Sequence, residues 1–467
     1  MKSRKFVHIF VIVGSILALC AVNTFGQTGE VIVRGGWLFD GTGNEVVKNN
    51  AIVVRGGKFM EVNIELAGRD ISGAQVIELG ENDYILPGFF DLHAHYNVNL
   101  IGKGRKDETK VNPVIYLANG VTSTFPAGEY NPEDMLELRR RIDRGEQIGP
   151  RLFNAGPYYG TARRGWFQDS SRQQIYATVD KWAELGARGF KAKGISPGQL
   201  QALIERAHWH GLTVTGHLGS GFRNSVNPRD AILMGIDRIE HFLGGDAITA
   251  DKRAYASLQN LDPDAPEVDE IIQLYIKHNV YFDATLTAYG YYGERKEGYD
   301  YWVDEKKFLS PYVLEYQKDH SPRRTLAQFE KIYWIKRRTI KKFYDAGGGY
   351  LITLGTDHPS TGEFIPGFSA HRELEAFVLS GIPPAAALKI ATINGARALD
   401  VGNKLGSIEP GKFADLMVIK GNPLDNIRNT RTVHLVMKSG KVYNSQALLK
   451  SVEGKMGPLD AAEAEKL

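Results

Sequence analysis

The chain has 467 residues, of which 43% are hydrophobic, so it is long enough to bury a large core and to form more than one domain. Its formal net charge is +3 and no basic run stands out, which argues against a nucleic-acid partner. Its single cysteine, Cys20, lies near the start, so the rest of the chain can form no disulfide and offers no thiolate as a metal ligand or nucleophile.

Residues 1–26 have the pattern of a secretory signal peptide. Basic side chains within the first five positions precede an apolar run at 6–22, and Thr24 and Gly26 supply the small residues that a signal peptidase requires. The run is short for a membrane span of roughly 20 residues. Leu19 stands where a lipoprotein signal needs a small residue. We therefore expect an exported protein, periplasmic or secreted, with no stable membrane anchor after cleavage.

Strand patterns occur at both ends of the remaining chain. Residues 27–85 and 398–446 contain short alternating segments, such as 31–34 and 51–55, separated by turns rich in glycine and asparagine. Strand-rich ends on either side of an α/β middle predict one small composite β-sandwich domain built from both ends. Residues 447–467 would form a C-terminal tail.

The middle of the chain, residues 86–397, alternates strand and helix patterns. Helical segments such as 133–144, 173–185 and 329–344 separate the strands. Eight alternating units fit an α/β fold of the (β/α)8 barrel type, whose active sites lie at the C-terminal ends of the strands. The predicted barrel strands lie at 86–95, 120–125, 151–155, 189–193, 212–217, 236–241, 280–286 and 350–356.

His93 and His95 stand at the end of the first barrel strand. Side chains two apart on a strand point to the same face, so both imidazoles can converge on one metal ion. His208 and His210 have the same spacing, but they lie in a segment with helical apolar spacing, where residues two apart do not face each other. The spacing alone is therefore weak evidence for a metal site.

Four further candidate ligands occur near the ends of later predicted strands: Lys191, His217, His241 and Asp357. Any one of them alone is more often a core or capping residue. Their order along successive strand ends is what favours a metal site, because the C-terminal ends of barrel strands meet at one face.

These motifs together resemble the metal-dependent amidohydrolases, in particular the branch that holds imidazolonepropionase-like hydrolases and the bacterial prolidases of that fold. The resemblance covers nearly all of the chain after the first thirty residues, and it is specific for the superfamily but not for a substrate. The segments that carry it are 86–95, 119–124, 186–191, 238–241, 355–357, 391–399 and 405–416.

The resemblance implies a binuclear centre of two divalent ions, and zinc is the metal we expect. The implied ligands are His93, His95, Lys191, His217, His241 and Asp357. In the family the lysine reacts with carbon dioxide, and the resulting carbamate bridges the two metals. Lys191 matches the family position, and Lys193, two residues along on the same face, is the rival.

Two metals lower the pKa of a bridging water from 15.7 toward roughly 7. Asp357 would accept the proton of that water and pass it to the leaving nitrogen, and a helix-capping role for Asp357 is compatible with this. The expected reaction is hydrolysis of an amide bond in a small peptide, an N-acyl amino acid or a cyclic amide.

Three other functions stay open: a lactonase or esterase, a mononuclear deaminase, and a non-catalytic barrel. Deaminases of this fold resemble one another in placing a glutamate a few residues after a barrel histidine, and neither His217 nor His241 has one. Glu240 precedes His241, and strand alternation predicts that it points to the opposite face.

The expected partner is a small molecule or a short peptide, and a homo-oligomer is compatible with the sequence. Arg163 and Arg164 follow the third strand and could clamp a substrate carboxylate, although a solvated surface pair is the alternative. His371 is a candidate substrate contact or a structural histidine. The long insert at 288–324, rich in tyrosine, is either a lid over the site or an interface or self-packed loop.

Overall fold

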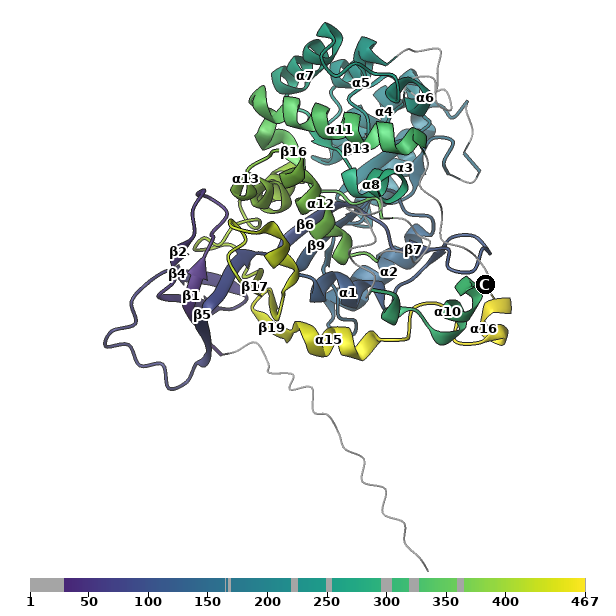
Figure 1. Ribbon diagram of the computed structural model, residues 1–467. Helices are drawn as coiled ribbons and strands as arrows, with labels where there is room; N and C mark the ends of the chain where they lie inside the picture. Colours follow the sequence, from purple (N-terminus) through teal and green to yellow (C-terminus); the bar gives the residue numbers. More distant parts are fainter. Residues whose placement is uncertain are drawn as a thin grey trace, which may run out of the picture.

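The computed structural model describes eight stretches of the chain, 29–163, 165–166, 169–219, 226–248, 254–294, 305–318, 327–358 and 365–466. The expected signal peptide at 1–26 and Arg164 lie outside these stretches. Within them, no helix is both long enough and apolar enough to span a membrane. Figure 1 shows two units, a sheet built by both ends of the chain and a larger α/β barrel beside it.

The smaller unit is a single eight-stranded sheet in the order β19-β18-β17-β5-β1-β3-β4, with β2 on β1. Its strands are β1 (Val31–Leu38), β2 (Val47–Lys48), β3 (Ala51–Arg55), β4 (Lys58–Val62), β5 (Gln75–Pro87), β17 (Leu416–Lys420), β18 (Leu435–Lys438) and β19 (Lys441–Asn444). β5 joins the two ends of the chain, because it pairs in parallel with β1 and antiparallel with β17. Apolar side chains from both ends of the chain share one small core, as expected for a domain built from both ends.

The barrel has parallel strands that run from β6 to β16. They are β6 (Phe89–Ala94), β9 (Val121–Pro126), β10 (Arg151–Leu152), β12 (Gly189–Lys193), β13 (Thr213–His217), β14 (Arg238–Glu240), β15 (Tyr281–Asp283) and β16 (Ile352–Thr353). A short strand, β11 (Tyr158–Tyr159), continues the third strand after a break and pairs with β12. The barrel closes where Leu92 N donates to Leu354 O at 2.9 Å. These strands confirm the predicted barrel.

Helices cover the outside of the barrel between the strands (Figure 1). They include α1 (Asn112–Ala118), α2 (Pro132–Asp143), α3 (Arg172–Glu184), α4 (Pro197–Trp209), α5 (Pro228–Met234), α7 (Pro266–His278), α11 (Ala327–Asp345), α12 (Phe368–Leu379) and α13 (Pro384–Lys389). Several begin with proline, whose fixed φ suits the first helical position and whose missing N–H is not needed there.

Helix α4 separates the second histidine pair as expected. His208 Nε2 lies 3.0 Å from Asp237 Oδ2, whereas His210 Nε2 lies 2.7 Å from Asp180 Oδ1. The two imidazoles therefore bind different carboxylates on different neighbours. In the described part of the chain neither histidine belongs to a group that could hold a metal.

Part of the predicted insert at 288–324 packs against the C-terminal tail. Helices α8 (Leu286–Gly293) and α10 (Pro311–Lys318) belong to the insert region, and the tail forms α15 (Ser445–Val452) and α16 (Ala461–Glu465). Ser310 N donates to Met456 O at 2.9 Å, and α10 lies close to α16 in Figure 1. These contacts make residues 305–318 a self-packed segment. Residues 295–304 and 319–326, with three of the aromatic side chains, lie outside the described residues, so the lid stays a hypothesis.

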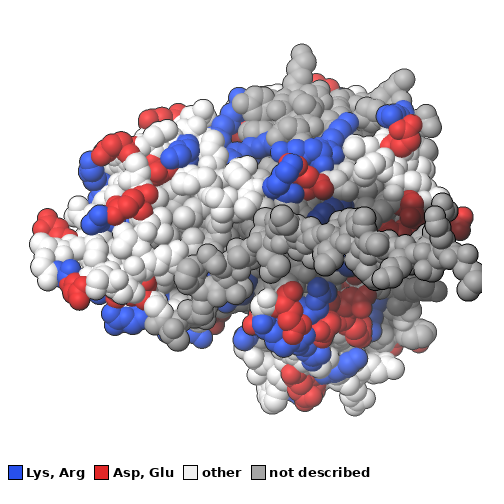
Figure 2. Space-filling view, turned by 90° about the horizontal axis from the view of Figure 1, so that it is seen from below, with Lys and Arg blue, Asp and Glu red and all other residues white. Residues whose placement is uncertain are grey.

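Basic and acidic side chains are interspersed on the face of the molecule that Figure 2 shows. Among the described residues, many charged side chains form exposed pairs, such as Arg34 with Glu78 and Arg144 with Glu146. Pairs of this kind contribute little stability because water screens them. They agree with the small formal net charge of +3.

We expect Gly88→Ala to destabilise the protein by about 1–3 kcal/mol, because it would overpack the junction between the sheet and the barrel. Gly88 lies between β5 and β6, and a Cβ atom there would stand 2.1 Å from Thr122 Oγ1. Urea unfolding followed by circular dichroism measures the change. Gly198→Ala in α4 is the matched control, since a Cβ there meets no atom within 4 Å. Equal midpoints for the two variants would show that the junction tolerates a side chain.

Candidate metal centre

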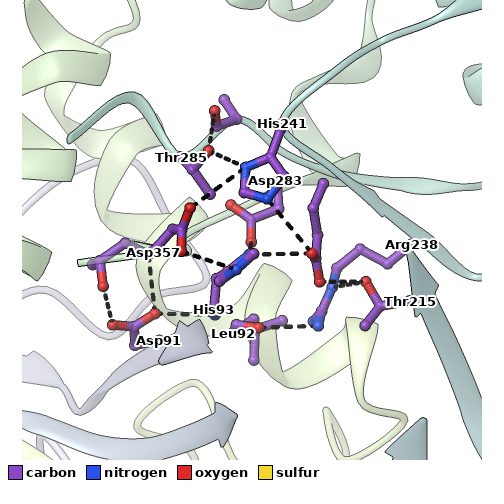
Figure 3. Close-up of polar contacts among 12 residues, drawn as sticks. Asp91, Leu92, His93, Thr215, Arg238, His241, Asp283, Thr285 and Asp357 are labelled. Carbon is purple, nitrogen blue, oxygen red and sulfur yellow. Dashed lines mark hydrogen bonds and ion pairs between the residues drawn. The ribbon is translucent and has the colours of Figure 1, made fainter. Parts of the chain in front are cut away.

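The strand ends of the barrel bring the predicted ligands to one face. The histidine rings form a continuous cluster, with centroids 5.2 Å apart for His93 and His95, 4.8 Å for His93 and His241, and 4.4 Å for His217 and His241. All four are buried. Asp357 is the most open member, with 32% of its side chain exposed. Figure 3 shows His93, His241 and Asp357 pointing toward one another.

His93, His95 and Asp357 form one group that could hold a metal ion. His95 Nε2 lies 2.9 Å from Asp357 Oδ1, and His93 Nε2 lies 3.5 Å from the same oxygen. In the described structure, the Nδ1 atoms of His93 and His95 are buried without hydrogen-bond partners. Buried polar atoms without partners are costly, so this donor set fits a bound cation.

The Asp91 carboxylate links the two chain segments that carry this group. Its carboxylate accepts hydrogen bonds from His93 N at 3.1 Å, Thr356 N at 3.1 Å and Thr356 Oγ1 at 2.7 Å. Asp357 N in turn donates to His93 O at 3.0 Å. Asp357 has a φ of +41°, an unusual conformation for a residue other than glycine, and these bonds support it. The first and last barrel strands are thereby fixed together at the candidate centre.

The surroundings of Asp357 keep its carboxylate ionised. Burial opposes the charge, but the hydrogen bond with His95 and the nearby His241 and His95 rings hold the pKa of Asp357 below its ordinary value. The side chain is therefore present as a base at neutral pH.

His241 follows the last residue of β14 and takes a φ of +67°. Its Nδ1 lies 2.7 Å from Thr285 Oγ1, and that hydroxyl donates its proton to Ala284 O at 2.7 Å. Thr285 must therefore accept from His241 Nδ1–H, which leaves Nε2 as an unprotonated donor atom for a metal. The buried Lys336 Nζ also donates to His241 O and holds the turn.

The direction of the Glu240 side chain differs from the one that strand alternation predicts. Its carboxylate lies inside the centre, with Oε2 3.4 Å from His93 Nδ1 and 3.9 Å from His241 Nε2, and it does not point to the opposite face. The left-handed backbone at His241 breaks the strand alternation, so adjacent side chains share one face. Glu240, His93 and His241 form a second group that could hold a metal ion.

Lys191 is 1% exposed and contacts the Glu240 carboxylate. Burial, followed by the charge of Lys193, lowers the pKa of Lys191 well below its ordinary value. A neutral amine is the form that can react with carbon dioxide. Lys193 is less buried and stands opposite His217 in the strand register.

Asp283 and Arg238 are further charged residues of the barrel interior that sequence reasoning missed. Asp283 Oδ2 lies 3.4 Å from His93 Nδ1, and Asp283 pairs with Glu240 in the strand register. Arg238 Nη2 donates to Leu92 O at 3.0 Å. Burial raises the pKa of Asp283 well above its ordinary value, although the charge of Arg238 opposes the shift. Asp283 ends the observed strand β15 (Tyr281–Asp283), whereas the predicted strand ran on to residue 286, so the sequence did not place Asp283 at a strand end.

The proposed substrate contacts have different outcomes. Arg163 is half-buried in the loop after β11, where its N–H donates to Gly160 O at 3.0 Å, and it forms no ion pair within the described residues. Arg164 lies outside those residues. The clamp therefore stays a hypothesis for this pair.

His371 lies in a buried position near the start of the first barrel strand. It is 2% exposed, its Nδ1 lies 3.1 Å from Thr430 Oγ1, and its ring lies 5.8 Å from the ring of Phe89 at the start of β6. Phe89 begins β6, whereas the candidate ligands lie at the other end of that strand, so His371 stands away from them. This position favours the structural alternative for His371, and a substrate contact stays a hypothesis.

Comparisons with known proteins agree with this geometry. Residues 84–443 match the sequence model of the amidohydrolase family. Adenine deaminase 4 of Rhizobium meliloti (strain 1021) is 39% identical over 93 residues, which cover 18% of this chain and only 15% of that curated relative.

Two solved structures share the fold over most of the chain. A Xaa-Pro dipeptidase with methionine bound in its active site has a TM-score of 0.66 and 21% identity, over 89% of this chain and 100% of that one. Molinate hydrolase has a TM-score of 0.70 and 20% identity, over 94% of this chain and 99% of that one. At these identities the likeness supports the fold.

Glu129, in the loop after β9, should make stability depend on pH. Its Oε1 accepts from Asn154 Nδ2 at 2.9 Å and Ala155 N at 3.1 Å, and burial raises the pKa of Glu129 to about 8. Between the ordinary pKa of a glutamate and about pH 8, the folded protein binds more protons than the unfolded chain. Stability therefore falls as pH rises through this window.

We expect Glu129→Gln to remove this pH dependence. The difference in unfolding free energy between the variant and wild type should shift by about 1–3 kcal/mol in favour of the variant from pH 5 to pH 9. Urea unfolding midpoints at the two pH values measure it. Glu133→Gln serves as the control, because the Glu133 side chain is 71% exposed. A wild-type slope that survives in Glu129→Gln would mean that other groups cause it.

Proposed function

Because the chain belongs to the amidohydrolase family, whose members are metal-dependent hydrolases of carbon–nitrogen bonds, we propose that it is a binuclear enzyme acting on small amides. The substrate class is a short peptide, an N-acyl amino acid or a cyclic amide. The observation that carries the proposal is the pair of ligand groups that share His93, one with His95 and Asp357 and the other with Glu240 and His241. His217, beside His241, completes the second position.

Bound divalent ions, zinc in our proposal, would acidify a water molecule and polarise the scissile carbonyl. The chain supplies the proton transfers. Asp357 Oδ1 faces His95 and His93, so Oδ2 is the oxygen that accepts the proton of the attacking water. Asp357 then delivers this proton to the leaving nitrogen as the C–N bond breaks, and the new C–O bond completes a carboxylic acid.

Lys191 is the proposed bridging ligand after it reacts with carbon dioxide. Its burial supports this role, because the neutral amine is favoured and the product carbamate supplies the negative charge that two cations require. Glu240 is the alternative anionic ligand, because its carboxylate already faces His93 and His241. Lys191 and Glu240 are in contact, and the carbamate measurement described below distinguishes the two as the bridging ligand.

A free carboxylate on the substrate is part of the proposal. The related dipeptidase holds methionine, an amino acid with a free carboxylate, in its active site. An exported enzyme would also meet peptides and environmental amides first. Ester or lactone cleavage at the same site is a possible result of the assay below.

Deamination is a second candidate because Glu240 lies among the ligands and part of the chain matches an adenine deaminase. That match covers 15% of the deaminase. Glu240 also contacts Lys191 inside the barrel, whereas a deaminase needs its glutamate free to protonate the ring. Ammonia release from adenine tests this candidate directly.

Protein reconstituted with zinc should bind about two equivalents of metal and release amino acids from dipeptides or N-acyl amino acids. Elemental analysis and amine detection measure the two results. Removal of zinc by a chelator should abolish turnover, and added zinc should restore it. One equivalent at saturation contradicts the binuclear centre, and lactone turnover without amide cleavage contradicts the amide substrate.

Lys191→Ala should lose one metal equivalent and nearly all activity, with partial rescue by short carboxylic acids that replace the carbamate. Lys193→Ala should keep both metals and most turnover. Nuclear magnetic resonance of protein exposed to carbon-13-labelled carbon dioxide should show a carbamate signal in Lys193→Ala and none in Lys191→Ala. If the carbamate signal disappears in Lys193→Ala alone, Lys193 is the carboxylated residue and the assignment to Lys191 is wrong. If wild type shows no carbamate signal and Glu240→Gln loses metal, Glu240 is the anionic ligand.

A further inference from the structure

A cationic side chain with no role so far lies close enough to the candidate centre for its charge to act on His95. Arg105 stands in the hairpin formed by β7 (Asn97–Val98) and β8 (Lys106–Asp107), which begins two residues after His95. Glu108 N donates to Tyr96 O at 2.8 Å and closes the hairpin. The hairpin is therefore anchored directly on the strand end that carries the first metal ligands.

The guanidinium of Arg105 lies on an aromatic support at the rim of the site. Its Cζ is 5.9 Å from the centroid of the Tyr130 ring, and Tyr130 packs edge-on against Tyr158 at 5.5 Å. Tyr158 stands opposite Lys191 in the strand register. Arg105 is exposed and forms no ion pair with any described residue, and the nearby Asp107 carboxylate accepts from Asn131 Nδ2 at 2.9 Å. An unpaired guanidinium beside the site can accept an anion.

His358 is a second polar group near this rim. It is 3% exposed, its ring lies 6.4 Å from that of His95, and neither ring nitrogen has a hydrogen-bond partner in the described part of the chain. The charge of Arg105 acts on both His95 and His358, so the three side chains lie in the same region. An imidazole ring carries at least one N–H donor, which a ligand can satisfy.

We propose that Arg105 and His358 form a subsite for the free carboxylate of the substrate, and that Arg105, in place of Arg163 or Arg164, gives the enzyme its preference for anionic amides. A planar guanidinium binds a carboxylate through two parallel hydrogen bonds, and an imidazole N–H binds it through a third. The subsite lies next to His95, so a substrate anchored there presents its amide bond to the neighbouring ligands. The inference rests on the proposed function and names its substrate class: dipeptides and N-acyl amino acids with a free α-carboxylate.

The first test measures binding without turnover. Isothermal titration calorimetry of the zinc-loaded full-length protein compares L-methionine with L-methioninamide, which lacks the carboxylate. Wild type should bind the acid about 10- to 100-fold more tightly than the amide, as expected for a charged hydrogen-bonded contact. Arg105→Ala should bind the two equally, and Arg105→Lys should keep part of the preference. Equal binding of both ligands by wild type overturns the subsite.

The matched control is Lys106→Ala, which removes the same charge from the same hairpin. Lys106 is exposed and should leave the preference unchanged, so a loss in both variants would mean a general charge effect, which also overturns the subsite. Metal analysis of Arg105→Ala should still give two equivalents, which separates loss of the subsite from loss of the centre. If Arg163→Ala removes the preference while Arg105→Ala keeps it, the carboxylate binds at Arg163 instead.

The kinetic test compares L-alanyl-L-methionine with its C-terminal amide. Arg105→Ala should raise KM for the free acid about 10- to 100-fold, leave kcat within a few-fold, and leave the amidated substrate unchanged. His358→Ala should weaken the same preference more modestly. No turnover of either substrate by wild type, together with an intact binding preference for methionine, would contradict the proposed amide hydrolysis but not the subsite.

Discussion

Closure of the barrel between its first and last strands is the constraint on which the candidate centre depends. Asp91 accepts two hydrogen bonds across this seam, from the N–H and the hydroxyl of Thr356, and a third from His93 N on its own strand. The seam is fully buried, so water cannot replace these bonds. Asp357 is more than 260 positions from His95 in the chain, and this seam brings the two side chains within hydrogen-bonding distance.

Charge balance inside the barrel is the second organising feature. Two buried acidic side chains, Glu240 and Asp283, face His93, and two buried basic side chains, Lys191 and Arg238, lie beside them. Isolated charges in such a place cost several kcal/mol, so each needs a partner or a metal. The same burial that makes the lysine a poor ammonium ion makes it a good nucleophile toward carbon dioxide. Structural and chemical roles of these residues are therefore coupled.

The loops around the strand ends have different roles at the candidate site. The turn at His241 fixes the tautomer of a ligand through Thr285, and Glu373 on α12 holds the start of α8 by accepting from Leu286 N at 2.8 Å and Thr287 N at 2.6 Å. The hairpin that carries Arg105 is closed by the bond from Glu108 N to Tyr96 O, and it exposes a cation that forms no ion pair with the described residues. Rigid elements thus hold the metal ligands, and an exposed hairpin offers the charge that selects a substrate.

The sequence alone predicted the barrel, the sheet formed by both chain ends and the candidate ligand positions, because strand and helix periods and ordered strand-end residues are local signals. β6, which carries His93 and is followed by His95, is the clearest case. Only the tertiary structure decided the side-chain directions that depend on unusual backbone. The φ of +67° at His241 brought Glu240 into the centre, against the alternation rule. Burial of His371 and the approach of Arg105 depend on packing between distant segments, and no single-chain pattern encodes which residues such packing will bring together.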